Sequence, residues 1–204
     1  VESANYRPAF ADRAVFFATE TGGLRALERD SGKTIWTHQL PNAANNKNSL
    51  PFSDPIADER AVYAAGGDGA VYAFDAATGK VLWKSIQGGE SWHGPAVGTL
   101  MKVDDRLCFC HYNHNLVCLN AGDGTEVWKR KSFSIQHPPV VLNGLLWVAN
   151  STTISAIDPA TGELRAEESF PFVRHSLGLS TDGRFLYLAY EDSIAQIRPF
   201  APVE

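Results

Sequence analysis

The sequence predicts an all-β protein built from repeated four-stranded antiparallel sheets, and three observations carry this prediction. First, one pattern with a shared glycine recurs in residues 24–36, 71–83, 116–128 and 154–166. Second, the first three copies place a tryptophan four residues after that glycine. Third, the 204 residues include 17 glycines, 11 prolines and one methionine, which indicates many turns and few long helices. Four-stranded repeats of roughly 40 residues are typical of the blades of a β-propeller.

The glycines and tryptophans of this pattern are used throughout as landmarks. The repeat glycines are Gly32, Gly79, Gly124 and Gly162, and the repeat tryptophans are Trp36, Trp83 and Trp128. The fourth copy has Ala166 in place of a tryptophan. We interpret the tryptophans as packing residues between blades rather than as platforms for a ligand.

Each copy is predicted to contribute four strands. Short apolar or aromatic runs, typical of buried strands, form the second strand of each copy at residues 61–65, 106–110, 145–149 and 185–189. The third strand opens each repeated segment, and the fourth follows its glycine. First strands are predicted at residues 53–57, 93–97 and 137–141.

Two kinds of turn join these strands. Residues 67–69 and 113–114 have the composition of tight hairpin turns between the second and third strands. Between the third and fourth strands, Asp75, Asn120 and Asp158 can accept backbone N–H groups as Asx turns, and the repeat glycine supplies the left-handed residue. The carboxylates of Asp68, Asp75, Asp123 and Asp158 are therefore predicted to have structural roles in turns rather than catalytic roles.

The number of blades is predicted to be five. A fifth copy, at residues 194–198, stops before its glycine would come, so one fourth strand is missing. Residues 1–6 could supply that strand and close a five-bladed ring. Alternatively, the chain is part of a ring of six to eight blades. We favour the compact ring, with residues 1–204 as one domain, because a half-ring exposes two large sheet faces.

The segment from Val71 to Trp83 reads Val-Tyr-Ala-x-Asp-x-x-Thr-Gly-Lys-x-x-Trp, which resembles the repeat of the pyrroloquinoline-quinone-type (quinoprotein-like) propellers. Residues 116–128 also match well, whereas residues 24–36 have Glu28 in place of the aspartate. The similarity covers residues 7–198. This resemblance implies a periplasmic or extracellular location, and a protein partner bound through loops and blade edges, as in some relatives.

The resemblance also raises the question of a quinone cofactor. Dehydrogenases of this kind press the quinone with a disulfide between adjacent cysteines, but Cys108, Cys110 and Cys118 include no adjacent pair. We therefore expect no pyrroloquinoline quinone. Pairing around residues 113–114 sets Cys118 opposite Phe109, on the other face from Cys108, so no disulfide is expected within the hairpin. The cysteines are expected to pack as small hydrophobic side chains.

A candidate site emerges where the first strand of each copy begins. Alignment of the copies puts one residue of each at the same position, predicted to face the mouth of the central channel: Tyr6, Ser53, His93, His137 and His175. Trp92 and Arg174 would line the same mouth. The three histidines can be interpreted as structural residues bonded to a neighbouring blade, as part of a ligand or protein pocket, or as a metal site for zinc, copper or iron.

Charge and hydropathy exclude two function classes. Eighteen basic and 23 acidic residues give a net charge of −5, without the basic stripe that nucleic-acid binding needs. No apolar run approaches 18 residues, so no membrane span is predicted.

The predicted function is a non-catalytic scaffold for protein–protein interaction, a possible subunit of an extracytoplasmic complex. One alternative is an enzyme or metal-binding propeller that uses His93, His137 and His175. The other is a fragment or subunit of a larger oxidoreductase of the quinone type.

Overall fold

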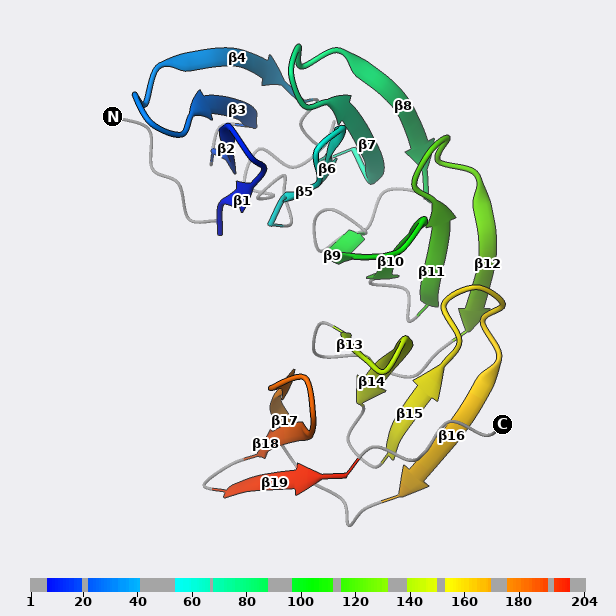
Figure 1. Cartoon of the computed structure of the whole chain (residues 1–204). Coiled ribbons are helices and arrows are strands. Elements are labelled where there is room, and N and C mark those ends of the chain that lie inside the picture. The colour runs from blue at the N-terminus through cyan, green and yellow to red at the C-terminus, as the bar shows by residue number, and fades with distance from the viewer. Residues whose placement is uncertain are drawn as a thin grey trace. The chain divides into compact units, whose positions relative to one another are not determined.

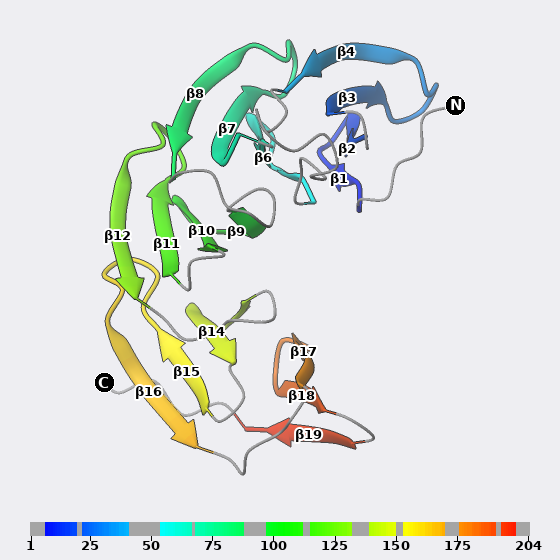
Figure 2. The same cartoon turned by 180° about the vertical axis from the view of Figure 1, so that it is seen from behind.

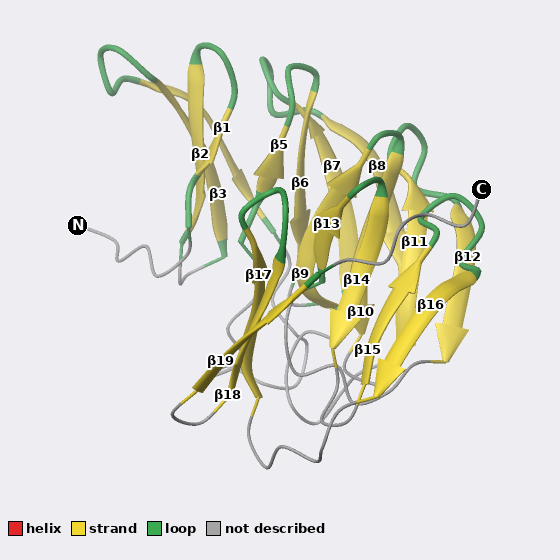
Figure 3. Cartoon of the chain, turned by 60° about the horizontal axis from the view of Figure 1, so that its bottom comes forward, coloured by secondary structure: helices red, strands yellow, loops and turns green. Residues whose placement is uncertain are grey.

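The computed structural model describes residues 7–19, 22–40, 54–66, 68–87, 97–111, 115–131, 139–149, 153–169, 176–190 and 193–198. Every regular element in these ranges is a strand, which confirms the all-β prediction (Figure 3). The chain divides into two compact units, residues 1–100 with 120–125 and residues 101–119 with 126–204.

The first unit contains two complete antiparallel sheets, each with its strands in sequence order (Figure 1). The first sheet consists of β1 (Ala9–Phe10), β2 (Ala14–Ala18), β3 (Gly23–Glu28) and β4 (Thr34–Gln39). The second sheet consists of β5 (Ile56–Ala57), β6 (Ala61–Ala65), β7 (Ala70–Asp75) and β8 (Val81–Ile86).

The remaining strands form three further sheets with the same order, seen from behind in Figure 2. The third sheet consists of β9 (Val97–Val103), β10 (Arg106–His111), β11 (Asn115–Asn120) and β12 (Glu126–Lys131). The fourth consists of β13 (Val140–Leu142), β14 (Leu145–Ala149), β15 (Thr153–Ile157) and β16 (Leu164–Ser169). The fifth has three strands among the described residues, β17 (Ser176–Thr181), β18 (Leu186–Tyr190) and β19 (Ser193–Ile197).

The predicted pattern of four strands per copy, with a fifth copy that lacks its last strand in the described ranges, is therefore confirmed. Strands β6 and β14 have the predicted bounds. The predicted first strands began at residues 53, 93 and 137, which lie outside the described residues, and the described strands begin at Ile56, Val97 and Val140. Residues 1–6, the proposed closing strand, also lie outside them.

Strand register places the same three repeat positions side by side in the first two sheets. In the first sheet Phe16 pairs with Ala26, which pairs with Trp36. In the second, Tyr63 and Trp83 pair with Ala73 from either side. A small residue between two large ones lets the aromatic side chains share one sheet face without overpacking.

The turns before the fourth strands have the predicted chemistry. Asp75 Oδ1 accepts the backbone N–H of Thr78 at 2.8 Å, and Asn120 and Asp158 act in the same way on residues two further along. Hydrogen bonds from the Thr78 hydroxyl and N–H lower the pKa of Asp75. The repeat glycines have φ between +70° and +75°, the left-handed conformation in which L residues are strained.

Within each unit, the hydrophobic core lies between neighbouring sheets. In the first unit Phe16 and Trp36 of one sheet pack against Val62 and Phe74 of the next, and the Trp36 and Phe74 ring centroids lie 6.3 Å apart. In the second unit, a similar cluster includes Trp147 of the fourth sheet and residues of β18. Each of these sheets is therefore buried on the face that meets its neighbour.

Candidate functional site

The seven residues predicted at the channel mouth all lie outside the described part of the chain: Tyr6, Ser53, Trp92, His93, His137, Arg174 and His175. Their convergence, as a pocket or as a metal site, stays a prediction. Among the described residues, no group of three or more His, Cys, Asp or Glu side chains could hold a metal ion. The described residue Arg7 donates its backbone N–H to Asp54 Oδ1 at 2.8 Å, which ties the start of the first sheet to the start of the second.

The repeat tryptophans dock each blade onto the next, as predicted. Each indole Nε1–H donates to a carbonyl oxygen in the following repeat, three residues before its glycine. The bonds are Trp36 to Ala76 at 2.9 Å, Trp83 to Ala121 at 3.0 Å and Trp128 to Pro159 at 2.9 Å. A buried indole N–H needs such an acceptor, so the hydrogen bond fixes the orientation of the ring.

The following repeat glycine lies directly against each indole ring. A Cβ atom on Gly79, Gly124 or Gly162 would lie 2.6, 2.5 or 2.7 Å from the nearest atom of Trp36, Trp83 or Trp128 respectively. These glycines are therefore required twice, for the positive φ and for the close approach of the ring. Glycine and tryptophan recur together because the tryptophan of one blade always contacts the glycine of the next.

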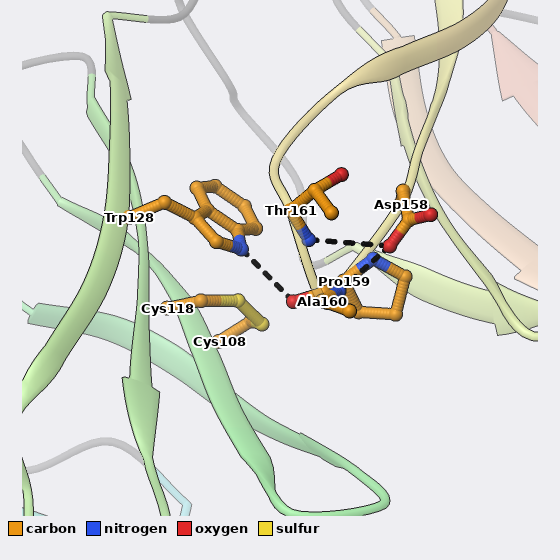
Figure 4. The surroundings of a disulfide bond; sticks show 7 residues. All are labelled: Cys108, Cys118, Trp128, Asp158, Pro159, Ala160 and Thr161. Carbon is orange, nitrogen blue, oxygen red and sulfur yellow. Dashed lines mark hydrogen bonds between the residues drawn. A yellow bond between two sulfur atoms is a disulfide. The ribbon is translucent and has the colours of Figure 1, made fainter.

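The cysteine prediction is wrong. Cys108 on β10 and Cys118 on β11 form a disulfide, with Cα atoms 4.1 Å apart (Figure 4). The prediction assumed a two-residue turn at residues 113–114, but Cys118 lies opposite Cys108 rather than Phe109. The disulfide takes the repeat position of the Phe16–Ala26 pair. Across the next strand, Cys118 pairs with Trp128, so the disulfide lies beside a docking tryptophan.

The third cysteine is a free thiol. Cys110 belongs to the same hydrophobic cluster as the disulfide, and burial raises the pKa of its thiol to about 12. The thiol is therefore protonated at neutral pH and is a poor nucleophile. For this residue, the predicted role as a small packing side chain is confirmed.

A three-residue polar cluster links the β6–β7 hairpin to the outer strand of the second sheet. Asp68 accepts a 2.6 Å hydrogen bond from the Tyr72 hydroxyl and a 2.8 Å ion pair from Lys84 on β8. Burial disfavours the Asp68 carboxylate, but the bonds from Lys84 and Tyr72 outweigh it and lower its pKa. Burial and the Asp68 hydrogen bond raise the pKa of Tyr72. Sequence analysis predicted the turn role of Asp68 but missed both side-chain partners.

The outer strand β8 presents an unusual amount of apolar surface. Leu82 is 52% exposed and Ile86 is 72% exposed. Val81 is also exposed. At the repeat positions of Lys84 and Ile86, β12 carries Lys129 and Lys131. We call Val81, Leu82 and Ile86, with the outer backbone of β8, the β8 edge.

The β8 edge is the candidate protein-binding surface. Among the described residues β8 pairs only with β7, so its outer backbone has no strand partner. An exposed apolar edge strand is a ready template for pairing with another strand. Sequence analysis missed this surface because the pattern Val-Leu-Trp at residues 81–83 does not show which side chains are exposed. Comparison of the outer strands with one another could have found it.

Comparison with known proteins identifies the family. A family profile described as "Outer membrane protein assembly factor BamB" matches residues 2–166. The chain belongs to this family. The relatives include BamB of Yersinia pestis, 27% identical over 146 residues that make up 69% of this chain and 35% of the relative. Tetrathionate hydrolase of Acidithiobacillus ferrooxidans is 26% identical over 151 residues, 69% of this chain and 23% of the relative.

Solved structures with similar folds are β-propeller proteins. BamB from Moraxella catarrhalis superimposes with a TM-score of 0.64 at 15% identity, over 97% of this chain and 74% of that one. A quinohemoprotein alcohol dehydrogenase from Pseudomonas putida HK5 has a TM-score of 0.58 at 16% identity, over 82% and 34% of the two chains. The five sheets are thus propeller blades of the quinone type, as predicted. The chain spans about a third or less of the length of the two curated relatives compared above.

One further observation concerns membranes. Within the described ranges, the structure contains no helix with the length and hydropathy needed to cross a bilayer.

Proposed function

We propose that this chain is a non-catalytic protein-binding scaffold of the machinery that assembles outer membrane proteins. The observation that carries this proposal is its membership, over residues 2–166, of the family described as outer membrane protein assembly factor BamB. The BamB proteins of Yersinia pestis and Salmonella typhimurium are relatives at 27% identity. The partner is accordingly a protein component of that machinery.

The roles of the polar side chains support a scaffold. Asp75 and Asp158 hold turns through backbone N–H groups, and Asp68 is engaged by Tyr72 and Lys84. Each of these carboxylates has a lowered pKa caused at least in part by hydrogen bonds that stabilise the blade. They are ionised at neutral pH and already bonded, which suits architecture better than proton transfer.

The disulfide supports a location outside the cytoplasm. Cys108 and Cys118 are buried in the third sheet and bonded to each other. Structural disulfides persist in the periplasm and outside the cell, whereas the cytosol keeps thiols reduced. The periplasmic or extracellular location first inferred from the resemblance thus gains support from the chain's own chemistry.

The β8 edge is the surface through which we expect the partner to bind. An extended segment of the partner would hydrogen-bond to the outer backbone of β8 and set apolar side chains on Leu82 and Ile86. Burial of two exposed aliphatic side chains provides affinity, and the alternation of the strand provides register.

The test measures binding of the purified chain to the purified outer-membrane assembly complex of the same organism. The double variant Leu82→Asp/Ile86→Asp should bind at least about tenfold more weakly, because two charges would enter an apolar contact. The matched control is Ile35→Asp on β4, which has the same repeat position as Leu82 and is 45% exposed. All three sites are at the surface, so the variants should fold.

The possible outcomes distinguish an error in the proposed function from an error in the proposed binding surface. If the unsubstituted chain does not bind the complex, the proposed function is wrong. If it binds and the double variant binds equally well, the function stands and the β8 edge is not the contact. Equal weakening by Ile35→Asp would show a general effect of charge rather than a local surface.

The prediction of a bound metal concerns the histidines at the predicted channel mouth. His93, His137 and His175 stay a candidate set for a transition metal, and no quinone is expected. Metal analysis of the purified protein tests the first of these and is described below.

A further inference from the structure

All three cysteines of the chain lie on one face of the third sheet. Cys108 on β10 and Cys118 on β11 are fully buried and bonded to each other, with Cα atoms 4.1 Å apart (Figure 4). Cys110 follows Cys108 by two residues on β10, so its side chain lies on the same face as the disulfide. It packs against the hydrophobic cluster that contains both bonded cysteines. The free thiol and the disulfide are therefore neighbours in one cluster.

Three cysteines can form one disulfide in three ways, and each way leaves one thiol free. Cys108 and Cys118 are ten residues apart, whereas Cys110 and Cys118 are eight apart. The entropic cost of closing a loop rises slowly with its length, and the shorter loop costs less. An unfolded chain should therefore form the Cys110–Cys118 disulfide about 1.4 times as often as the Cys108–Cys118 disulfide.

The folded sheet favours the other pair. Cys108 and Cys118 lie directly opposite each other across β10 and β11, as the separation of their Cα atoms shows. Cys110 is then diagonal to Cys118, and diagonal Cα atoms in an antiparallel pair are about 7–8 Å apart. Cysteines more than about 7 Å apart cannot be bridged unless the backbone moves, so a Cys110–Cys118 disulfide would distort the pairing of β10 with β11.

We propose that the third sheet acquires its disulfide by intramolecular thiol–disulfide exchange, in which Cys110 is the leaving thiol, and that packing of Cys110 into the cluster then ends the exchange. The proposal rests on the positions of the three cysteines. It does not depend on the proposed assembly function.

The exchange needs no other reactant. In a chain with the Cys110–Cys118 disulfide, the free Cys108 thiol gives its proton to solvent and the thiolate attacks Cys118 Sγ. The Cys108–Cys118 bond forms, the Cys110–Cys118 bond breaks, and the Cys110 thiolate takes a proton from solvent. In a chain with the Cys108–Cys110 disulfide, Cys118 attacks Cys108 Sγ and releases the same thiol. Both steps conserve one disulfide and one thiol, so no oxidant or reductant is consumed.

Burial explains why the exchange ends when the sheet folds. Both bonded cysteines are fully buried, so the disulfide is shielded from thiols in solution. Burial also raises the pKa of the Cys110 thiol to about 12, so the thiolate that could reopen the disulfide is scarce at neutral pH. An unfolded cysteine has a pKa of about 8.5 and exchanges readily. Folding thus leaves a fixed disulfide and an unreactive thiol.

The test starts from the reduced chain, which is oxidised by air in urea so that disulfides form before folding. Peptide mapping by mass spectrometry should find the Cys110–Cys118 disulfide at least as abundant as the Cys108–Cys118 disulfide. Half of the sample is treated with iodoacetamide, which blocks the free thiol, and the excess reagent is removed. Both halves are then transferred to urea-free buffer at pH 8 without added thiol.

The two halves should behave differently. The untreated half should convert to the Cys108–Cys118 disulfide, and the conversion should be at least about tenfold slower at pH 6 because fewer thiols are ionised. The blocked half should keep its mixture. In the folded chain, Cys110 should react with iodoacetamide at least about tenfold more slowly than in urea, because its thiol is buried and protonated.

Cys110→Ala is the matched control variant, because it keeps both bonded cysteines and removes the leaving thiol. Oxidation of this variant in urea should give the Cys108–Cys118 disulfide alone. Treatment with iodoacetamide should then have no effect on its refolding, since no thiol is left to block.

Four results would overturn the proposal. Formation of Cys108–Cys118 alone in urea would show that no exchange is needed. Equal conversion of the blocked and untreated halves, or conversion only after a thiol is added, would show that the exchange is not intramolecular. A folded chain that returns to a mixture of disulfides at pH 8 would show that packing of Cys110 does not end it.

Discussion

Substitution of a repeat glycine by alanine should reveal how much the tryptophan docking contributes to stability. Gly79→Ala adds a methyl group whose carbon would lie 2.6 Å from Trp36 Cδ2, at a residue with φ +71°. Gly32→Ala adds the same group at φ +70°, with no described atom within 4 Å. The two variants therefore share the backbone strain and differ in the indole contact.

The magnitudes follow from these two contributions. An L residue in the left-handed conformation costs about 1–2 kcal/mol, which is the whole expected effect of Gly32→Ala. A forced overlap in a packed core costs about a further 1–3 kcal/mol, because the indole is held by its hydrogen bond to Ala76 and cannot move away freely. Gly79→Ala should accordingly be less stable than Gly32→Ala by about 1–3 kcal/mol.

The assay is equilibrium unfolding in urea followed by circular dichroism. The Trp36→Ala variant provides the control. In a chain without this indole ring, Gly79→Ala should destabilise the fold no more than Gly32→Ala does, so Trp36→Ala and Gly79→Ala should be strongly coupled. Equal destabilisation by Gly32→Ala and Gly79→Ala, or additivity of Trp36→Ala with Gly79→Ala, would refute the role assigned to the glycine.

Three other predictions concern the disulfide, the polar cluster and the histidines. Cys108 and Cys118 are ten residues apart, so reduction of their disulfide should lower the free energy of unfolding by about 3 kcal/mol. The Cys108→Ala/Cys118→Ala variant should be insensitive to dithiothreitol. Equal urea midpoints of the unsubstituted chain with and without reductant would contradict this prediction. The pKa of Asp68 is lower in the folded chain than in the unfolded one, so the stability it contributes is present above about pH 4 and is lost as the pH falls through its folded pKa. Asp68→Asn should therefore lose less stability than the unsubstituted chain between neutral and acid pH, and parallel pH profiles of the urea midpoint would argue against the cluster. Elemental analysis of the purified protein should find less than one equivalent of zinc, copper or iron, whereas stoichiometric metal that disappears in the His93→Ala/His137→Ala/His175→Ala variant would establish the metal site instead.

The fold could be predicted from sequence because the repeated glycines and tryptophans are the residues that contact each other between blades. The tryptophan at 36 and the glycine at 79 are far apart in sequence, yet both are fixed by a single contact, so the pattern recurs wherever that contact does. The Asx turns at Asp75 and Asp158 were predictable for a local reason, since the side chain bonds to the backbone of its own turn.

The disulfide could not be found by considering one hairpin alone. Its register depends on the length of the connection, and a two-residue turn places Cys118 opposite the wrong residue. In the first two sheets five residues separate the last paired positions, Ala18 with Leu24 and Ala65 with Val71. Transfer of that register to the third copy sets Cys108 opposite Cys118, so the repeat itself contained the missing signal.

The β8 edge could not be predicted from β8 alone, because exposure depends on what packs against a strand, and only comparison with Lys129 and Lys131 of β12 gives a contrast. Leu82 and Ile35 hold the same repeat position on different blades and are both exposed, but the apolar patterns around them do not show this in the sequence. The polar cluster of Asp68, Tyr72 and Lys84 joins residues of a hairpin and an outer strand whose register had first to be known.

The serial docking of blades through tryptophan and glycine is tested most directly by NMR of the intact chain. The indole rings of Trp36, Trp83 and Trp128 should give through-space contacts to the α-protons of Gly79, Gly124 and Gly162 and shift those protons upfield. The α-protons of Gly32, which no described indole contacts, provide the reference for these two effects. Ordinary shifts at Gly79, Gly124 and Gly162, without contacts to an indole, would contradict the arrangement of blades described above.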